Sequence, residues 1–378
     1  MKQQIPRLCL AVTLAATLFT GDARAQGVSS EFVVSGAAAD AILDSTTINL
    51  ATAEAIAGTC ARLAEEEGVA VSVYVIDNDG NHVYVHRMDG QTWTNVATAE
   101  MKALTALRIR GPSKALMNQV IRNPNDEWRE MELGLFANAG GLPIIVDNQL
   151  IGAIGVGGSA ARVAEGWSDE ICAHEAMTEV LGPQPPLLED LPRERPAAQV
   201  PMPRFSPEAP PRPTLPAEFV VSGPAAGRIY DAHQVSAGAA ATVAAGCRQW
   251  IAARGGSASI FVIDNTGLAV HAERMDGQVS QDVKTALRKA ETALRGRGPT
   301  SAREAGAHNN PGGFPRSVTL FDFYSVAGGV PIVVDGQLIG SVGVSGTGEN
   351  DEACAVAGLQ AAFGERVTVP VYPEAGRR

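Results

Sequence analysis

Two short segments carry side chains that could bind iron or another ligand. They are NHVYVHRMDG (residues 81–90) and LAVHAERMDG (residues 268–277). Successive side chains of a β-strand alternate between the two faces, so His82, Tyr84 and His86 are expected to share one face. Imidazole and phenolate are ligands that iron accepts, which makes His82 and His86 candidate metal ligands. The alternative is that these side chains lie on the solvent side of an edge strand without a ligand.

Both segments end in the tetrapeptide RMDG, whose polar groups could bind an anion beside a metal. Arginine forms paired hydrogen bonds with carboxylates, and methionine sulfur can approach iron. In the alternative interpretation, Asp89 caps the following turn and the arginines form ordinary ion pairs. The candidate ligand-binding residues here are Arg87, Met88, Arg274 and Met275, with Lys102 and Lys289 in the helices that follow.

These segments belong to a tandem duplication. EFVVSG occurs at Glu31 and Glu218, and RMDGQ occurs at Arg87 and Arg274, with the same spacing between the copies. The stretch between the copies is rich in proline, which favours an extended spacer. We therefore expect a signal peptide at residues 1–25, a first domain at 26–182, a linker at 183–215 and a second domain at 216–378.

Each copy shows the same order of elements. Apolar alternation on both sides of a turn predicts β-hairpins, including one around Asp147–Asn148 and one around Asp335–Gly336. The glycines nearby lie within a strand, where they mark a bulge or the close approach of another backbone; they do not fit a nucleotide-binding fingerprint. Helices are expected at residues 49–67, 95–109, 169–181, 236–254, 282–295 and 349–363. This pattern predicts an α+β fold with a mainly antiparallel sheet.

The combination of these motifs resembles the HbpS/GlcG-like heme-binding (heme-degrading) family. It is carried by VIDNDGNHVYVHRMDG, EMKALTALR and GGLPIIVDNQLIGAIGVGG in the first copy, and by VIDNTGLAVHAERMDG, LRKAETALR and GGVPIVVDGQLIGSVGVSG in the second. The resemblance implies a five-stranded antiparallel sheet flanked by helices, assembly into oligomers, and heme or iron binding in some members. Fold transfers between relatives better than activity does.

With this resemblance, the candidate residues suggest a heme site. Arginine or lysine beside an apolar slot would pair with the two propionates, while histidine or methionine approached the iron. The second copy has Ala269, His271 and Glu273 where the first has His82, Tyr84 and His86. We therefore expect at most one copy to keep a complete site. His174 and His233 are interpreted as ordinary helix-surface residues, and His308 as part of a loop rich in glycine and proline.

The cysteines predict two disulfides. Each copy has one cysteine in its first expected helix and one in its last, as an oxidising compartment would pair them. The alternative is four buried free thiols. The expected pairs are Cys60 with Cys172 and Cys247 with Cys354.

The chain's ends and charge restrict its location and partners. Lys2, an apolar run at residues 8–20 and Ala23–Arg24–Ala25 have the pattern of a cleaved secretory signal, so a periplasmic or secreted protein is expected. No later stretch is apolar for long enough to span a membrane. A net charge of −11 argues against nucleic acid as a partner. We expect a homo-oligomer or an internal pseudo-dimer.

Three functions remain open from the sequence. The leading hypothesis is an exported protein that captures or buffers heme or iron, with slow heme degradation as an extension. The second is a non-catalytic accessory subunit of an exported redox partner. The third is a binding protein or enzyme for a small carboxylate, with Arg87 or Arg274 as the anion clamp. No nucleophile elbow or metalloprotease motif occurs, so the positive case for an enzyme is weak.

Overall fold

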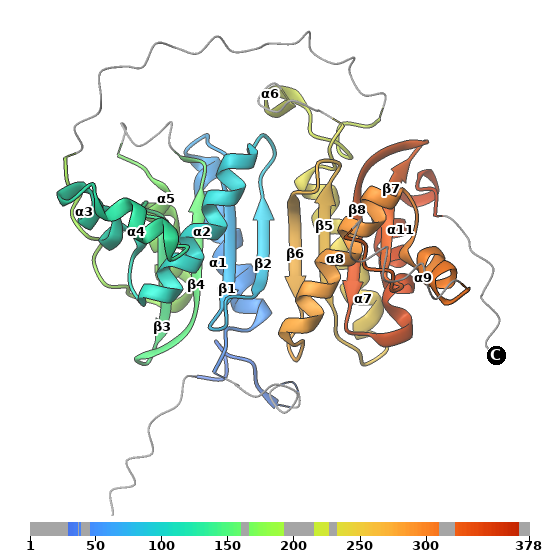
Figure 1. Ribbon diagram of the computed structural model, residues 1–378, viewed down its shortest axis with the longest axis horizontal. Coiled ribbons are helices and arrows are strands. Elements are labelled where there is room, and N and C mark those ends of the chain that lie inside the picture. The colour runs from blue at the N-terminus through green and yellow to red at the C-terminus, as the bar shows by residue number, and fades with distance from the viewer. Residues whose placement is uncertain are drawn as a thin grey trace, which may run out of the picture.

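The structure is a computed structural model that describes residues 29–36, 38, 46–159, 166–192, 215–226, 233–309 and 322–369. The expected signal segment and most of the expected linker lie outside these residues. Within them, both copies fold as α+β units, as the sequence predicts, and they lie side by side (Figure 1).

All eight strands of the described residues form one antiparallel sheet. Its order is β3-β4-β1-β2-β6-β5-β8-β7, so each repeat contributes four neighbouring strands instead of the five that the family resemblance implies. The first repeat supplies β1 (Ser72–Asp77), β2 (His82–Arg87), β3 (Gly141–Val146) and β4 (Gln149–Gly157). The second supplies β5 (Ser259–Asp264), β6 (Ala269–Arg274), β7 (Gly329–Val334) and β8 (Gln337–Ser345).

The two repeats join where β2 pairs with β6. Tyr84 lies opposite Glu273, and His86 lies opposite His271. The unpaired N–H and C=O groups of an edge strand tend to pair with another strand, and here the inner strand of each repeat pairs with that of the other. The alternative interpretation, in which His82, Tyr84 and His86 lie on the solvent side of an edge strand, is therefore wrong, because β2 is a central strand of an internal pseudo-dimer.

Helices cover both faces of the sheet. One face carries α1 (Leu50–Glu66) and α5 (Asp169–Leu181) in the first repeat, with α7 (Ala237–Ala252) and α11 (Asp351–Phe363) in the second. The opposite face carries α2 (Trp93–Ile109) and α8 (Ser280–Gly296), and these six helices agree closely with the expected ranges. The shorter helices, which the sequence does not predict, are α3 (Ser113–Arg122), α4 (Asp126–Glu132), α6 (Gly223–Ala226) and α9 (Thr300–Asn309), with 3₁₀ turns at Gly348–Asn350 and Gly364–Arg366.

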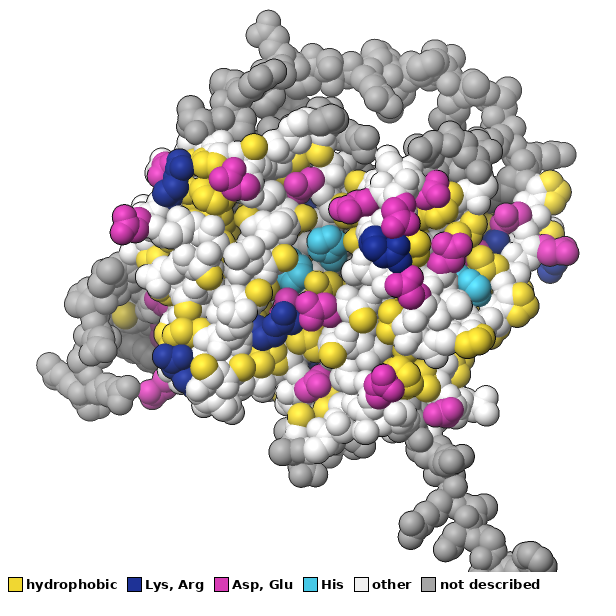
Figure 2. Space-filling model, turned by 180° about the vertical axis from the view of Figure 1, so that it is seen from behind, with side chains coloured by type: hydrophobic (Ala, Val, Ile, Leu, Met, Phe, Trp, Pro, Cys, Tyr) yellow, Lys and Arg dark blue, Asp and Glu magenta, His cyan; other side chains and the backbone are white. Residues whose placement is uncertain are grey.

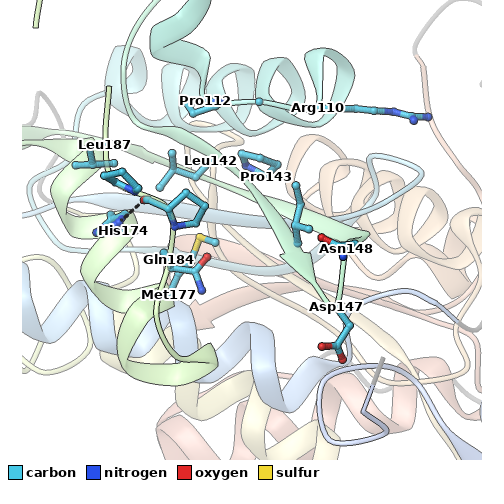
Figure 3. Close-up of a pocket in the computed structure, with 14 residues that line it drawn as sticks. Arg110, Pro112, Leu142, Pro143, Asp147, Asn148, His174, Met177, Gln184 and Leu187 are labelled. Carbon is cyan, nitrogen blue, oxygen red and sulfur yellow. Dashed lines mark hydrogen bonds between the residues drawn. The ribbon is translucent and has the colours of Figure 1, made fainter. Parts of the chain in front are cut away.

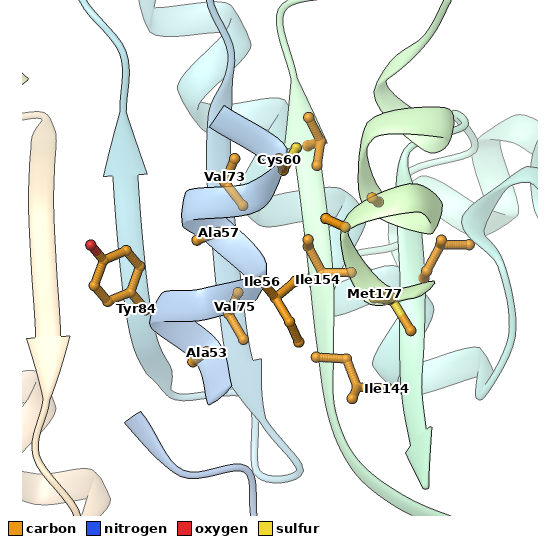
Figure 4. Packing of buried hydrophobic residues seen from close by; sticks show 14 of the residues in the cluster. Ala53, Ile56, Ala57, Cys60, Val73, Val75, Tyr84, Ile144, Ile154 and Met177 are labelled. Carbon is orange, nitrogen blue, oxygen red and sulfur yellow. The ribbon is translucent and has the colours of Figure 1, made fainter. Parts of the chain in front are cut away.

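Three buried cores hold these layers together. Figure 4 shows the first core, in which Ile56 of α1 and Met177 of α5 pack on Ile144 and Ile154 of the sheet. A second core repeats this arrangement beneath α7 and α11. The third core, beneath α2 and α8, contains side chains from both repeats and continues across the β2–β6 boundary. The two repeats therefore share apolar surface and do not pack as independent domains.

The glycine-rich segments have the structural roles that the sequence predicts. Asp147, Asn148, Asp335 and Gly336 have positive φ angles, as a two-residue hairpin turn requires. A Cβ atom at Gly155 or Gly343 would collide with helix backbone, at Gly155 with the carbonyl oxygen of Ala99, whereas at Gly152 it would collide with the neighbouring strand. Gly155 and Gly343 let α2 and α8 lie directly on the sheet. Because the sheet is antiparallel, a nucleotide-type fold is excluded for the described residues.

Both predicted disulfides are present. Cys60 of α1 is bonded to Cys172 of α5, with 5.2 Å between their Cα atoms, and Cys247 of α7 is bonded to Cys354 of α11, with 4.7 Å. All four side chains are buried. The free-thiol alternative is therefore wrong. Among the described helices, none combines the length and the hydropathy needed to cross a bilayer.

Candidate functional site

The RMDG arginines form ion pairs across the boundary between the repeats. Arg87 Nη1 lies 2.7 Å from Oδ2 of Asp264, and Arg274 forms the reciprocal ion pair with Asp77. Each of these aspartates also holds the β-turn of its own repeat, since Asp77 Oδ1 accepts hydrogen bonds from the backbone of Asp79 and Asn81. All four charged side chains are buried. The arginines therefore have fixed partners and are not free to clamp a carboxylate.

The RMDG aspartates cap helices of the opposite repeat. Asp276 accepts a hydrogen bond from the backbone N–H of Leu50 at the start of α1, and Asp89 accepts one from Ala237 at the start of α7, both at 2.9 Å. Burial raises the pKa of both carboxyl groups above their ordinary value. Of the two interpretations of the RMDG segments, the one with a capping aspartate and ordinary ion pairs is closer to the structure than the ligand site. Asp89, however, caps a helix of the other repeat and not the turn that follows it.

The remaining shared candidates also have internal partners. The sulfurs of Met88 and Met275 each accept a backbone N–H at 3.3 Å. Lys102 Nζ lies 2.7 Å from Asp169 Oδ2, and Lys289 Nζ lies 2.6 Å from Asp351 Oδ2. Both lysines are buried, and these ion pairs tie α2 and α8 to the first residues of α5 and α11. The described structure therefore gives Met88, Met275, Lys102 and Lys289 a role in holding the fold together.

A β-bulge separates the three aromatic candidates of β2. The register between β1 and β2 shifts at Val83, so that His82 pairs with Ile76 while Tyr84 pairs with Val75. A bulge inserts one extra residue and reverses the alternation beyond it. His82 therefore points to the α2 face, where its Nε2 lies 2.8 Å from Oε1 of Glu100. The expectation that His82, Tyr84 and His86 share one face is wrong.

His82 and His86 consequently cannot bind the same metal ion. Tyr84 packs with the core beneath α1 and α5, on the face that His86 shares, whereas the ring of His82 lies against Tyr74 and Phe261 of the opposite core. Among the described residues, no group of three or more histidine, cysteine, aspartate or glutamate side chains is arranged to hold a metal.

A polar cluster lies at the boundary between the repeats, made of the buried Tyr84, His271 and Glu273 and the partly buried His86. The rings of His86 and His271 lie 6.1 Å apart, and His271 Nε2 lies 2.9 Å from Oε1 of Glu273. Arg248 of α7 completes the cluster, 3.1 Å from Glu273. Figure 2 shows histidine side chains at the centre of this face, between the two halves of the molecule. The cluster brings together candidates from both copies, but within a packed boundary.

Protonation of His86 is expected to destabilise the protein. Burial and the neighbouring His271 hold the pKa of His86 at about 4 instead of the ordinary 6.5. The unfolded chain therefore takes up this proton first as the pH falls. We expect the free energy of unfolding to decline between pH 6.5 and 4, and the variant His86→Gln to decline less. Urea denaturation at pH 7 and pH 4.5 tests this, and identical pH dependence of the two proteins would contradict it.

A pocket in the first repeat lies away from these residues. It has a volume of about 520 Å³ and lies between β3, α5, the loop after α2 and the proline segment, which we define as residues 183–188. Leu142, Pro143 and Ile145 form one wall, and Met177 lies at its base (Figure 3). Its volume is in the range of small-molecule sites, which are mostly apolar with a few polar groups.

Few polar groups accompany these apolar walls. His174 of α5 reaches the proline segment, where its Nε2 lies 2.9 Å from the carbonyl oxygen of Pro185 and must donate to it (Figure 3). Arg110 extends from the rim, away from the apolar side chains (Figure 3). Lys114 of α3 holds the next part of the chain, donating to the carbonyl of Leu188 at 2.8 Å.

The second repeat closes the corresponding place with backbone pairing. Thr368 donates its N–H to Val333 at 2.8 Å, which covers the outer edge of β7. Aligning the last helices through Cys172 and Cys354 places Pro186 where the second repeat has Thr368. Proline has no N–H, so it cannot make this bond. The pocket beside β3 results from this difference.

The sequence did not indicate that His174 lines a pocket. In the same alignment, Val356 occupies its place in the second repeat. The sequence signal that could have indicated this pocket is the presence of His174, Pro185 and Pro186 in the first repeat alone. His233, the other residue interpreted as an ordinary helix-surface histidine, lies just before α7. The side chain of His308 lies outside the described residues.

Comparison with known protein families gives one match, which covers both repeats. A family model described as "Haem degrading protein HbpS-like" matches residues 48–178 and again residues 235–360. Protein GlcG of Escherichia coli (strain K12) is 42% identical over 89 residues, which are 24% of this chain and 64% of GlcG, so the match spans less than two thirds of that relative.

Two further relatives match most of their own length. A 15.0 kDa protein from the dhaT-dhaS intergenic region of Citrobacter freundii is 32% identical over 135 residues, which are 35% of this chain and 90% of that protein. The crystal structure of Klebsiella pneumoniae protein ORFY is 27% identical with a TM-score of 0.32, over 36% of this chain and 92% of that one.

Proposed function

This chain belongs to the HbpS-like family, and from that premise we propose that it binds heme in the pocket of its first repeat. The observation that carries the proposal is the apolar pocket of about 520 Å³ with His174 beside it. Heme sites need an apolar slot, a nitrogen or sulfur ligand for the iron, and cations for the propionates. Leu142, Ile145, Met177, His174 and Arg110 supply these groups.

The residues predicted from the sequence fit heme less well. Arg87, Arg274, Lys102 and Lys289 already have buried carboxylate partners, so a propionate would have to displace them. Removing one partner of a buried ion pair is strongly unfavourable. The same contacts argue against a small-carboxylate clamp at these residues. The pocket of the first repeat requires no such rearrangement of buried charges.

Three parts of the pocket would each contact a different part of heme. The apolar wall of β3 would exclude water from the porphyrin ring. His174 would hold the iron through Nε2, the nitrogen atom that now donates to the carbonyl of Pro185. Arg110 at the rim would pair with a propionate. We propose that this pocket captures and buffers heme and does not break it down.

A hemin titration tests this proposal. We expect the full chain to give a shifted Soret band that saturates at one heme per chain. His174→Ala should weaken binding at least about tenfold, because even groups that only support a metal ligand are worth that much. His82→Ala is the control, since its ring lies on the opposite face of the sheet. Loss of the Soret shift in His82→Ala but not in His174→Ala would refute the assignment.

We also propose that the protein acts outside the cytoplasm. The two buried disulfides support this, because such bonds persist in oxidising compartments. The second candidate function is that of an accessory subunit of a redox partner. It is favoured because most polar residues shared by the two repeats join the repeats to each other, as expected of a structural subunit. Purification of the protein from the native compartment would distinguish the two, by bound heme or by a stoichiometric partner.

A further inference from the structure

A second pocket, of about 420 Å³, lies at the boundary between the repeats on the α2 side. The β1–β2 turn and the end of α2 belong to the first repeat, and Lys284 of α8 comes from the second. Its lining is largely polar, with Leu104 and Leu107 beneath the charged side chains. Neither repeat forms this pocket alone.

Cations without acidic partners gather at this pocket. Most lysine and arginine side chains of the described residues lie within an ion pair. Arg108, Arg110 and Lys284 form none with described residues, and all three line the pocket. Arg108 donates to the carbonyl of Gly134 at 2.9 Å. Asp79 is the single carboxylate of the lining, so the local charge is positive on a chain whose net charge is −11.

The turn that carries the pocket is held in place. Asp77 accepts the backbone N–H groups of Asp79 and Asn81 at 2.9 and 2.7 Å. Asn81 Nδ2 then donates to the hydroxyl of Ser280 at 2.6 Å, at the first residue of α8. Lys284 lies one helical turn after Ser280. This hydrogen bond fixes the position of the second repeat's lysine relative to the first repeat's turn.

The corresponding place in the second repeat provides an internal comparison. A smaller cavity there, of about 230 Å³, is lined by Thr266, Glu291 and Arg295. Arg295 lies 3.5 Å from Glu291 and 3.7 Å from Asp322, so its charge is compensated. The residue equivalent to Lys284 is Ala97, which carries no charge. The concentration of free cations is therefore particular to one of the two equivalent places.

We propose that the pocket formed by Arg108, Arg110 and Lys284 binds a small anion with several negative oxygens. Guanidinium and ammonium groups recognise carboxylate and phosphate oxygens by charge-assisted hydrogen bonds. A dianion or trianion can compensate cations from both repeats at once, whereas a monoanion compensates a single positive charge. The site is separate from the proposed heme pocket, although Arg110 lies at the rim of both.

Calorimetric titration of the full chain at low ionic strength tests this site, with citrate and pyrophosphate as probes for the carboxylate and phosphate classes. We expect saturable binding of at least one probe, at one per chain. Exposed charge pairs contribute up to about 1 kcal/mol, so Arg108→Ala and Lys284→Ala should each weaken binding about two- to fivefold. Asp79→Asn should strengthen it.

Arg297→Ala is the matched control. Arg297 is the counterpart of Arg110 in the second repeat, has no acidic partner among the described residues and does not line this pocket, so its replacement should leave affinity unchanged. The absence of saturable heat with both probes, or equal losses in Arg297→Ala and Lys284→Ala, would overturn the proposal. The two sites are distinguished because Lys284→Ala should retain hemin binding and His174→Ala should retain anion binding.

Discussion

Replacement of Arg87 by alanine is expected to lower the free energy of unfolding by about 3–5 kcal/mol, the cost of breaking a buried ion pair from one side. The side chain of Asp264 has no exposed surface, and without Arg87 it would carry an uncompensated charge. Its Oδ1 would still accept hydrogen bonds from Thr266 and Leu268. The loss would therefore come from the oxygen that faces the other repeat.

Urea or guanidinium denaturation measures this effect, with Arg62→Ala as the control. Arg62 pairs with Glu66 and Glu179 on an exposed surface, so its removal should cost less than about 1 kcal/mol. The double variant Arg87→Met/Asp264→Leu should recover much of the stability, because both charges are then absent. Equal effects of Arg87→Ala and Arg62→Ala would show that the contact between the repeats contributes little.

Removal of the second disulfide is expected to have an effect of similar size. Cys247 and Cys354 are separated by 107 residues, and closing such a loop stabilises by about 4–5 kcal/mol on the chain-entropy model. The variant Cys247→Ala/Cys354→Ala should therefore unfold at much lower denaturant concentration. The equivalent variant at Cys60 and Cys172 provides the comparison, since its separation is 112 residues.

Measurement under reducing conditions separates the covalent bond from packing. A reductant should destabilise the wild type but leave unchanged the stability of a variant that lacks the four disulfide-forming cysteines. If the Cys247→Ala/Cys354→Ala variant unfolded at the wild-type midpoint, the disulfide would add nothing beyond the contact between α7 and α11.

The sequence was sufficient for the parts of the fold that depend on local signals. Asp147–Asn148 and Asp335–Gly336 specify hairpins because few other residues accept positive φ angles. The paired cysteines identified which helices lie side by side, since each copy has one in its first helix and one in its last. The strand glycines were correctly assigned to close backbone contacts because their spacing does not suit a phosphate loop.

The pairing of the two repeats could not be predicted from local sequence signals. Nothing in HVYVHR distinguishes an edge strand from one that pairs with the equivalent strand of the other repeat, so an edge strand stayed open as an alternative. The bulge at Val83 leaves the apparent alternation of the sequence intact while it reverses the direction of His82. Arg87 was given a ligand role because its partner, Asp264, lies 177 residues away in the chain.

The candidate site followed from a difference between the copies and not from their shared motifs. Shared residues such as Lys102 and Lys289 maintain the common architecture, so their presence in both copies reflects folding. Pro186 and His174 occur in the first copy alone, and they change the surface without disturbing the core. Comparison of the repeats position by position is therefore the more informative search for binding residues in this chain.

Pairing of β2 with β6 inside one polypeptide has an evolutionary consequence. In a dimer of identical subunits, every substitution appears twice, so a residue harmful at one position of the assembly cannot be kept for its benefit at the other. Here each repeat has its own stretch of the chain, so a substitution in one repeat does not appear in the other, and the two always pair within the same molecule. A substitution in one repeat can therefore be kept without the same change at the equivalent position of the other repeat.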